Sequence, residues 1–421
     1  MKRIGIRDED KYAMERRSAL TPKHAQALIE KHGIQIDVLS SKKRAFTDKE
    51  FLEKGCNIVD NLDDNRIIFG IKEIPIDKIA SDKTYIIFSH VIKGQAHNMP
   101  MLKKFMEKKC NLIDYECIVD DNNKRLIFFG HYAGLAGTIN TLWAFGLRTA
   151  HLGITTPFKK LRQTHTYFSL DEALETIKEI GKDITTNGLP KELLPLTIGI
   201  TGYGNVSKGA QEILKHLPVI EITPEELLEL KQKATYSDKH IYKIVFYEKH
   251  IAKHKKGAAF DLNEFFTQPA NFISNFNQYT PHLSILLNCM YWDDRYDRLI
   301  TKDYLADLYS NKNLRLHVIG DITCDPNGSI EFTHMGTEIN DPIFVYHPIT
   351  RNLLSDIKAK VLWLWQLTFY PASFLVILPM LLPMHSHLLS TTSLLVISQQ
   401  IMKILVCRHL LKKHSFFIME N

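Results

Sequence analysis

One short stretch of the sequence limits the fold more than any other. Residues 197–214 contain an apolar run typical of a buried strand, a Gly202-x-Gly204 turn, and a helical pattern that starts near Asn205. Gly202 permits a tight turn, and Gly204 lets the backbone approach a ligand closely. The start of the helix presents N–H groups and a positive dipole, which suit a pyrophosphate. This order of elements predicts a Rossmann-like α/β domain that binds a dinucleotide.

Two further positions bear on which dinucleotide binds. The third glycine slot of the full fingerprint holds Ser207, and Gly209 follows two residues later. About twenty residues beyond the turn, the segment PVIEIT ends near Glu221, where an acidic residue accepts the ribose 2′-hydroxyl of NAD. A carboxylate repels the 2′-phosphate of NADP, so Glu221 by itself favours NAD. An exposed glutamate at the end of a strand is the alternative.

The first 130 residues alternate short apolar runs with helical patterns, which is typical of α/β folds. Thr21, Pro22 and Gly33 have the residue types expected at the start and end of the first helix. We expect two Rossmann-like domains with a cleft between them, the second binding the dinucleotide. The expected strands of the first domain are KRIGIR, QIDVLS, RIIFGI, TYIIFSH, CNLIDYE and LIFFG.

The domain boundaries follow from where these patterns change. We expect an N-terminal substrate domain over residues 1–135, connecting helices over 136–188, and the dinucleotide domain over 189–360. The helical pattern of residues 131–153 has many Ala and Gly residues and suits close packing against other helices. The later strands of the second domain are expected in PVIEIT, HLSILLNCMYW and LRLHVIGDIT.

Composition excludes several classes of protein. The chain has 421 residues, 45% of them apolar and 24% charged, and the net charge of +6 is spread rather than gathered into nucleic-acid-binding blocks. The six cysteines form no CxxC pair, and His250 and His254 stand among lysines that repel a cation. We therefore expect no metal and no nucleic-acid partner. The N-terminus has no leader pattern, which predicts a cytoplasmic protein, or a mitochondrial matrix protein if a presequence was omitted.

Lys72 and His90 are the candidate catalytic pair. Each follows an expected strand of the first domain, in the segments RIIFGIKEIP and TYIIFSHVIKG. Because parallel strands end at the same edge of a sheet, both side chains should reach one crevice, where they can exchange protons with a substrate. A solvated lysine and a helix-capping histidine are the alternative.

Three other charged residues are candidates for ligand binding. Arg17 precedes the first helix in MERRSALTP, and its guanidinium can hold a substrate carboxylate with two hydrogen bonds. A solvated loop is the alternative there. Asp321 ends an expected strand at the crevice edge, and Asp325 lies in an adjacent Asn-Gly turn. Turn formation alone accounts for Asp325.

Several segments taken together resemble one family. These are IGIRDEDKYAMERRSALTPKH, FGIKEIP, FSHVIKGQAHNM, LIDYE, FFGHYAGLAGTIN, TGYGNVSKGAQEI, LLNCMYW and GDITCDPNGSIEF. They are similar to the lysine-ketoglutarate reductase half of bifunctional α-aminoadipic semialdehyde synthases, relatives of alanine dehydrogenases and saccharopine dehydrogenases. The resemblance runs in order from Met1 to about Lys360.

The resemblance implies an oxidoreductase of lysine degradation. It would condense L-lysine with 2-oxoglutarate and reduce the imine with NADPH to saccharopine. Lys72 and His90 match the catalytic lysine and histidine of the family, and Arg17 matches its carboxylate clamp. We follow the resemblance and expect NADP, with NAD left open by the charge of Glu221. The expected cofactor-binding residues are Gly202, Gly204, Asn205, Val206, Ser207, Glu221, Asn288, Asp321 and Asp325.

Other interpretations remain beside this one. An alanine-dehydrogenase-like amino-acid dehydrogenase is the alternative from the same superfamily, and an inactive truncated or frameshifted product is the alternative from another class. The expected partners are the small molecules lysine, 2-oxoglutarate and saccharopine, and the formation of a homo-oligomer is left open. Long members of the family continue into a saccharopine dehydrogenase domain that these residues do not include.

The resemblance stops near Lys360, where an uncharged run begins. No Asp, Glu, Lys or Arg occurs between Lys360 and Lys403. A run of this length is a membrane-span candidate, but Pro371, Pro379 and Pro383 interrupt it. Shifting the reading frame of plausible codons restores several family-like words in order. We therefore interpret residues 361–421 as a partly out-of-frame tail, which predicts that the last strand and helices of the second domain are missing.

Overall fold

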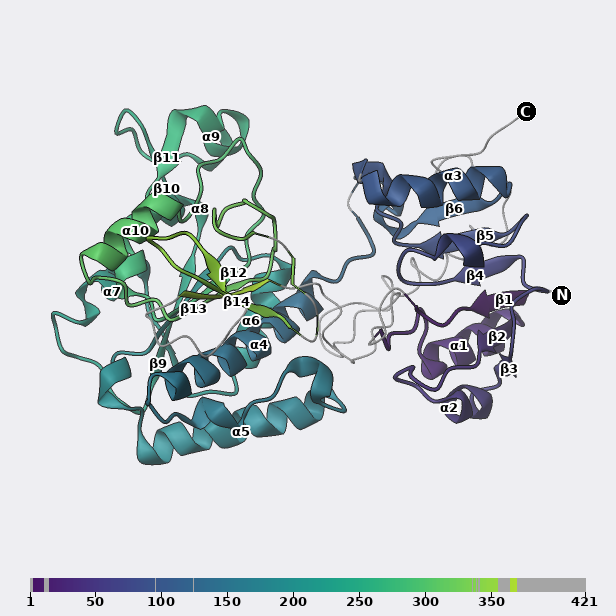
Figure 1. Cartoon of the computed structure of the whole chain (residues 1–421), viewed down its shortest axis with the longest axis horizontal. Coiled ribbons are helices and arrows are strands. Elements are labelled where there is room, and N and C mark those ends of the chain that lie inside the picture. The colour runs from purple at the N-terminus through teal and green to yellow at the C-terminus, as the bar shows by residue number, and fades with distance from the viewer. Residues whose placement is uncertain are drawn as a thin grey trace. The chain divides into compact units, whose positions relative to one another are not determined.

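The computed structural model describes most of the chain up to residue 354. The described residues are 3–10, 15–94, 96–123, 125–334, 336–337, 339, 341–354 and 364–368. They divide into two compact units between Phe128 and Phe129, each with its own sheet (Figure 1). The predicted α/β class is confirmed. The predicted tail lies outside the described residues except for 364–368.

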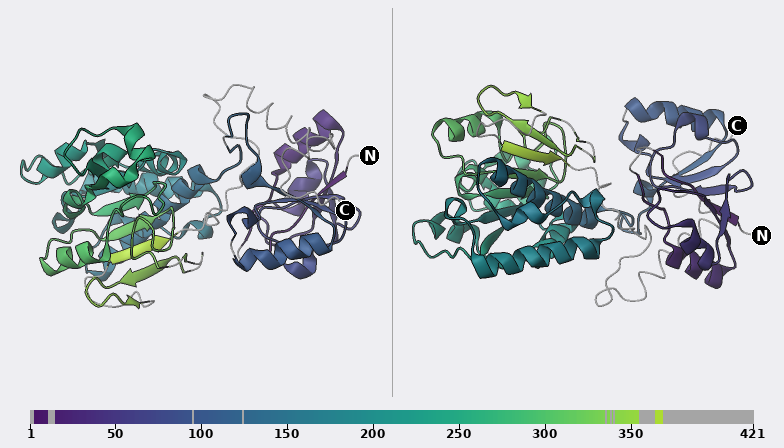
Figure 2. Two further views of the ribbon diagram at one scale, coloured as in Figure 1. Left: turned by 90° about the horizontal axis from the view of Figure 1, so that it is seen from above. Right: turned by 60° about the horizontal axis from the view of Figure 1, so that its bottom comes forward.

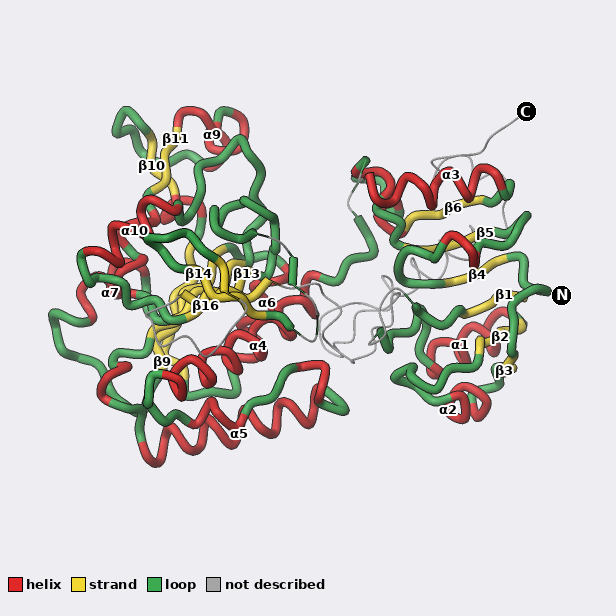
Figure 3. The backbone as a smooth tube through the Cα atoms, in the orientation of Figure 1, coloured by secondary structure: helices red, strands yellow, loops and turns green. Residues whose placement is uncertain are grey.

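The first unit is built on six parallel strands in the order β3-β2-β1-β4-β5-β6 (Figure 3). The chain proceeds outward from β1 in one direction and then from β4 in the other, so the order reverses between these two strands. In such sheets ligands bind at the carboxyl ends of the strands at the reversal. The elements are β1 Arg3–Ile6, α1 Pro22–His32, β2 Gln35–Leu39, α2 Asp48–Glu53, β3 Asn57–Val59, β4 Ile67–Phe69, β5 Thr84–Ile87, α3 Met99–Glu107 and β6 Asn111–Asp114.

The first helix forms where its cap residues predict. The Thr21 hydroxyl accepts a hydrogen bond from the backbone N–H of His24 at 3.2 Å, which satisfies a donor left open by the helix. Pro22 occupies the first turn, and Gly33 ends the helix in the left-handed conformation with φ of 61°. Local sequence alone therefore sets the position of α1 after β1.

The second unit contains a larger sheet in the order β15-β14-β16-β13-β12-β7-β9-β8. Strands β8, β9, β7, β12, β13 and β16 are parallel, and β14 and β15 join in antiparallel pairs at one edge, coloured yellow-green in Figure 2. The helices are α4 Gly130–His151, α5 Leu170–Asn187, α6 Asn205–Leu214, α7 Pro224–Leu230, α8 Glu248–Ile251, α9 Leu262–Thr267 and α10 Lys302–Ser310. The strands are β7 Thr197–Thr201, β8 Val219–Glu221, β9 Ile241–Phe246, β10 Ala252–His254, β11 Phe272–Ser274, β12 Ile285–Asn288, β13 Val318–Asp321, β14 Ile343–Tyr346, β15 Leu353–Leu354 and β16 Leu364–Thr368.

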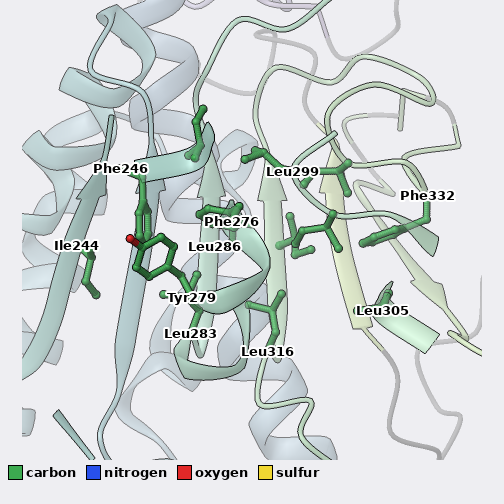
Figure 4. Close-up of a cluster of buried hydrophobic side chains, with 14 of the residues drawn as sticks. Ile244, Phe246, Phe276, Tyr279, Leu283, Leu286, Leu299, Leu305, Leu316 and Phe332 are labelled. Atoms are coloured by element: carbon green, nitrogen blue, oxygen red, sulfur yellow. The ribbon is translucent and has the colours of Figure 1, made fainter. Parts of the chain in front are cut away.

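An aromatic core covers part of this second sheet (Figure 4). Phe246 at the end of β9 packs against Phe276 and Tyr279, with ring centroids 5.0 Å apart in both pairs. Leu286 of β12 and Ile319 of β13 are fully buried in the same cluster. Because offset and edge-on aromatic contacts add to the burial of apolar surface, this core fixes the end of β9 firmly.

Three sequence expectations need correction. Residues 126–129 form no strand, because the chain bridges Val119 to Arg125 and then enters α4 at Gly130. The strand β9 was not predicted, although it is the neighbour of β7. The expectation that the last strand is missing is wrong for residues 364–368, which pair with β13 as β16.

Candidate active site

The first unit brings Lys72 and His90 together. Lys72 follows β4 and His90 follows β5, and these strands are neighbours that end at the same edge of the sheet. The Nζ atom of Lys72 lies 3.2 Å from Nε2 of His90. Lys72 is buried and His90 is partly exposed, so the pair combines a desolvated amine with an imidazole that solvent or substrate can reach. This geometry suits proton transfer.

Glu116 orients the imidazole. Its Oε2 atom lies 3.1 Å from Nδ1 of His90, and its Oε1 atom accepts a hydrogen bond from Nη1 of Arg125 at 3.1 Å. His90 has a φ of 55°, a left-handed conformation that costs energy for a residue other than glycine. A carboxylate that holds one ring nitrogen sets the direction of the other. Glu116 therefore aims Nε2 of His90 at Lys72.

Sequence analysis did not single out Glu116 or Glu9. Glu116 lies in LIDYE just after β6, the strand next to β5, and that position was the available signal. Glu9 follows β1 and is buried; its carboxylate accepts the backbone N–H groups of Ile71 at 2.8 Å and Lys72 at 3.0 Å. Burial raises the pKa of Glu9. Glu9 thus holds the chain that presents Lys72.

Arg17 is buried, and Glu15 holds it in a two-point ion pair. Nε of Arg17 lies 2.7 Å from Oε1 of Glu15, and Nη2 lies 2.5 Å from Oε2. Burial raises the pKa of Glu15, but the charge and hydrogen bonds of Arg17 outweigh it and the net shift is downward. A substrate carboxylate that used this same edge of the guanidinium would have to displace Glu15.

The second unit presents the glycine turn at the carboxyl end of β7. Gly202 has a φ of 79°, and its N–H donates to the carbonyl of Phe246 at 2.9 Å. Gly204 has a φ of −71°, which any residue adopts, and a Cβ atom added there would meet nothing within 4 Å. The fold itself therefore does not require glycine at 204. Open space before α6, whose start no side chain caps, fits a pyrophosphate.

The predicted residues that follow the turn have different surroundings. Asn205 is exposed, Val206 is partly buried, and the buried hydroxyl of Ser207 accepts a hydrogen bond from Nε2 of Gln211 at 3.1 Å. A Cβ atom added to Gly209 would lie 1.9 Å from the carbonyl oxygen of His131 on α4. Gly209 thus allows α6 to pack closely on α4, a role that the sequence did not reveal.

Asn288 and Asp321 form a buried network at the ends of β12 and β13. Nδ2 of Asn288 donates to Oδ1 of Asp321 at 2.8 Å, and the hydroxyl of Thr201 donates to Oδ1 of Asn288 at 2.8 Å. Burial raises the pKa of Asp321. These bonds tie β7, β12 and β13 together just below the glycine turn. Asp325 lies farther along, exposed, in a turn closed by the N–H of Gly328 at 2.9 Å.

Glu221 lies away from the glycine turn. Its strand, β8, is the edge strand, and β9 separates it from β7. Glu221 pairs with Lys243 in the sheet, and Lys243 pairs with Ile198, four residues before Gly202. The Glu221 carboxylate forms an ion pair with Nζ of Lys243 at 2.6 Å. The structure therefore does not bring Glu221 to the turn.

Fold and site together define a class of protein. Two mainly parallel sheets, with the Lys72–His90 pair after one and the glycine turn after the other, make this a two-domain α/β protein of the Rossmann-like class. Residues 5–136 match the family model described as alanine dehydrogenase/PNT, N-terminal domain. An L-alanine dehydrogenase structure aligns with a TM-score of 0.55 at 14% identity, covering 98% of this chain and 92% of that one, which shows a shared fold.

The particular relatives narrow this class. The alpha-aminoadipic semialdehyde synthase of Arabidopsis thaliana is 37% identical over 387 residues, covering 88% of this chain. The saccharopine dehydrogenase [NAD(+), L-lysine-forming] of Emericella nidulans is 26% identical over 351 residues, covering 81% of this chain and 80% of the relative. The chain is thus similar to the alpha-aminoadipic semialdehyde synthases, as its motifs predict, and residues 5–136 match the model of the alanine dehydrogenase/PNT N-terminal domain.

The chain corresponds to only part of this relative. It spans 36% of the length of the Arabidopsis thaliana protein. Among the described residues, no helix has the length and apolar character needed to cross a bilayer. Within those same residues, no three side chains of the metal-binding types come together.

Proposed function

We propose that the protein condenses L-lysine with 2-oxoglutarate and reduces the resulting imine to saccharopine. The observation that carries the proposal is the 3.2 Å contact between Lys72 and His90, which is held by Glu116 and placed at the carboxyl ends of adjacent parallel strands. Imine formation requires one group that removes a proton from the amine and one that delivers a proton to the departing hydroxyl. A paired lysine and imidazole supply both.

The first step is attack of the lysine ε-amine on the ketone carbon. The amine must be neutral, and His90 is placed to take its proton through Nε2, because Glu116 holds Nδ1. The product is a carbinolamine. Protonation of its hydroxyl by the Lys72–His90 pair lets water leave and gives the imine. The buried surroundings of Lys72 limit the return of bulk water, which favours dehydration.

The reduction needs a hydride, which a reduced nicotinamide dinucleotide supplies when bound. The residues that would hold this group are Gly202 and Gly204 at the turn and the first N–H groups of α6. The buried bonds among Thr201, Asn288 and Asp321 keep the neighbouring strand ends rigid. The resemblance favours NADP as the form of the cofactor. The residues beside the turn favour NAD.

Arg17 is the proposed site for a substrate carboxylate. Its guanidinium is buried and preorganised by Glu15, and both substrates carry carboxylates. A substrate carboxylate that replaced Glu15 on this guanidinium would keep the positive charge of Arg17 paired.

The test is a coupled measurement of dinucleotide oxidation and product. Purified protein should oxidise the reduced cofactor only when lysine and 2-oxoglutarate are both present, and mass spectrometry should detect saccharopine. An alanine-dehydrogenase-like enzyme would instead need ammonia and a 2-oxo acid without lysine. Oxidation that does not depend on lysine would contradict the proposal.

We also propose that residues 361–421 are translated partly out of frame. Sequencing the transcript across the codons for Ser355 to Asn421 tests this directly. One base missing or added relative to this reading would support it, and the restored chain would then be the one to assay. A transcript that confirms the frame would contradict it.

A further inference from the structure

The sheet order moves the cofactor-reading position to a different residue. In a dinucleotide-binding sheet, the strand beside the glycine strand carries, just past its carboxyl end, the side chain that meets the adenosine ribose. Here β9 lies beside β7, and β8 lies one strand farther out. The side chains after Phe246 are therefore in the reading position, and those after β8 are not.

The register makes this placement definite. Thr201 pairs with Phe246, and Gly202 donates its N–H to the carbonyl of Phe246 at 2.9 Å. Glu221 is level with Ile198 instead. At strand spacings of about 4.8 Å and a rise of about 3.3 Å per residue, Glu221 lies two strands across and four residues back from Gly202, roughly 16 Å away.

Glu248 is the acidic residue at the correct level. It is partly buried at the start of α8, two residues past β9. The charge of Glu248 is the main reason that the pKa of Tyr203, the middle residue of the Gly202-x-Gly204 turn, is raised. The carboxylate therefore lies close to the turn itself.

Two tyrosines hold this arrangement in place. The rings of Tyr203 and Tyr247 stack with centroids 5.2 Å apart and planes 27° apart. The backbone N–H of Tyr247 donates to Nδ1 of His250 at 3.0 Å, which caps the short α8 turn. Both tyrosines remain 44–45% exposed beside the turn, although aromatic rings are normally covered. The site is built, but one face of it is open.

We infer that Glu248 accepts the ribose hydroxyls of a dinucleotide bound at the Gly202-x-Gly204 turn, so that this chain selects NADH over NADPH. A carboxylate offers about four acceptor positions, which is enough for two ribose hydroxyls. A 2′-phosphate would instead bring about two negative charges next to Glu248. This inference rests on the proposed cofactor site and replaces Glu221 as its selective residue.

One nearby cation opposes this selection. Lys249 follows Glu248 directly and is exposed, so it is the group that would attract a 2′-phosphate if NADPH were preferred. Its neighbour His250 is buried, which lowers the pKa of that imidazole and keeps it neutral near pH 7. Glu248 and Lys249 therefore make opposite predictions that one experiment separates.

The experiment measures binding without substrates. Dissociation constants for NADH and NADPH are measured by quenching of the protein's tryptophan fluorescence, and adenosine 5′-monophosphate and adenosine 2′,5′-bisphosphate serve as competitors that isolate the ribose position. We expect NADH to bind at least about tenfold more tightly, from charge repulsion at close range in a partly screened site. Glu248→Gln should bring the two constants together, mainly by tightening NADPH.

Glu221→Gln is the matched control, because it removes the same charge from the edge strand, and it should leave the ratio unchanged. The inference is overturned if wild-type protein prefers NADPH, and loss of that preference in Lys249→Gln would assign it to Lys249. It is also overturned if Glu221→Gln rather than Glu248→Gln changes the ratio of the two dissociation constants. Failure of both dinucleotides to bind would overturn it as well. Selective NADH binding without saccharopine formation would refute the proposed function alone. Saccharopine formation with NADPH alone would refute this inference alone.

Discussion

The two sheets of the protein use the same parallel architecture for different chemistry. In the first unit the carboxyl ends of β1, β4, β5 and β6 carry charged side chains that hold one another, including Glu9, Lys72, His90 and Glu116. In the second unit the carboxyl end of β7 carries two glycines and open space. We propose that the first edge moves protons and that the second admits the phosphates of a dinucleotide.

The difference follows from what each edge must hold. Charged groups that act on a substrate have to be positioned against their own repulsion and desolvation, so they need fixed partners such as Glu9 and Glu116. A dinucleotide brings its own charges and needs only space, N–H groups and one selective side chain. This contrast predicts that mutations in the two units separate chemistry from cofactor binding.

The largest expected effect is on the first unit alone. Lys72→Met removes the buried amine next to His90 and should lower kcat by roughly 10²–10⁴-fold, the usual contribution of a positioned acid or base. The dissociation constant for the dinucleotide should stay as in the wild type. Lys104→Met on the surface of α3 is the control and should retain activity. A parallel loss of cofactor binding in Lys72→Met would break the proposed division of labour.

The next largest effect comes from two glycines of the second unit. Gly209 allows two helices to pack closely, and Gly204 leaves space for a ligand. Gly209→Ala places a Cβ atom 1.9 Å from a carbonyl oxygen of α4, so the helices must separate. We expect about 3 kcal/mol of destabilisation or more, seen as a lower Tm. Gly204→Ala should leave Tm nearly unchanged and weaken dinucleotide binding. Equal losses of stability in both variants would show that Gly204 is also a packing residue.

A smaller effect is expected at Glu116. Glu116→Gln keeps an oxygen near Nδ1 of His90 but removes the charge, so kcat should fall by about tenfold, the value of one charged hydrogen bond. Glu107→Gln, on the surface at the end of α3, should leave kcat unchanged. An unchanged kcat in Glu116→Gln would mean that Glu116 only supports the fold.

The smallest effect is spectroscopic and concerns the selective side chain of the second unit. The negative charge of Glu248 opposes ionisation of Tyr203, and so the pKa of Tyr203 is raised. Removing that charge with Glu248→Gln should move the pKa of Tyr203 down towards its ordinary value. Absorbance at 295 nm against pH, taken as the difference from matched Tyr203→Phe proteins, reports this. An unchanged titration would place Glu248 away from the turn.

The sequence predicted those parts of the fold that depend on neighbouring residues. The capping of α1 by Thr21 and Gly33 and the strand–turn–helix unit at Gly202 depend on a few adjacent positions, so local preferences decide them. The order of apolar runs also fixed the edge of the sheet on which Lys72 and His90 lie. Their contact at 3.2 Å was therefore predictable in kind, although not in distance.

Sequence reasoning failed where two distant segments had to be ordered in space. Glu221 is the predicted ribose-binding residue because PVIEIT is the next apolar run after the turn, and no strand is predicted in IYKIVF. The signal was present, since that run is rich in β-branched and aromatic residues. A strand's neighbours, however, are not written in its own sequence.

Neighbouring residues alone therefore predict the local geometry: the caps, the glycine turn, and the residue types available for proton transfer. Three features became visible only in the three-dimensional structure. Strand β9 rather than β8 lies beside β7, Glu116 rather than solvent contacts His90, and Gly209 allows α6 to pack on α4. The physical reason is that strand order follows from how helices and aromatic side chains such as Phe246 pack over the whole sheet. That packing joins residues far apart in the sequence. The proposed selectivity for NADH depends on that strand order.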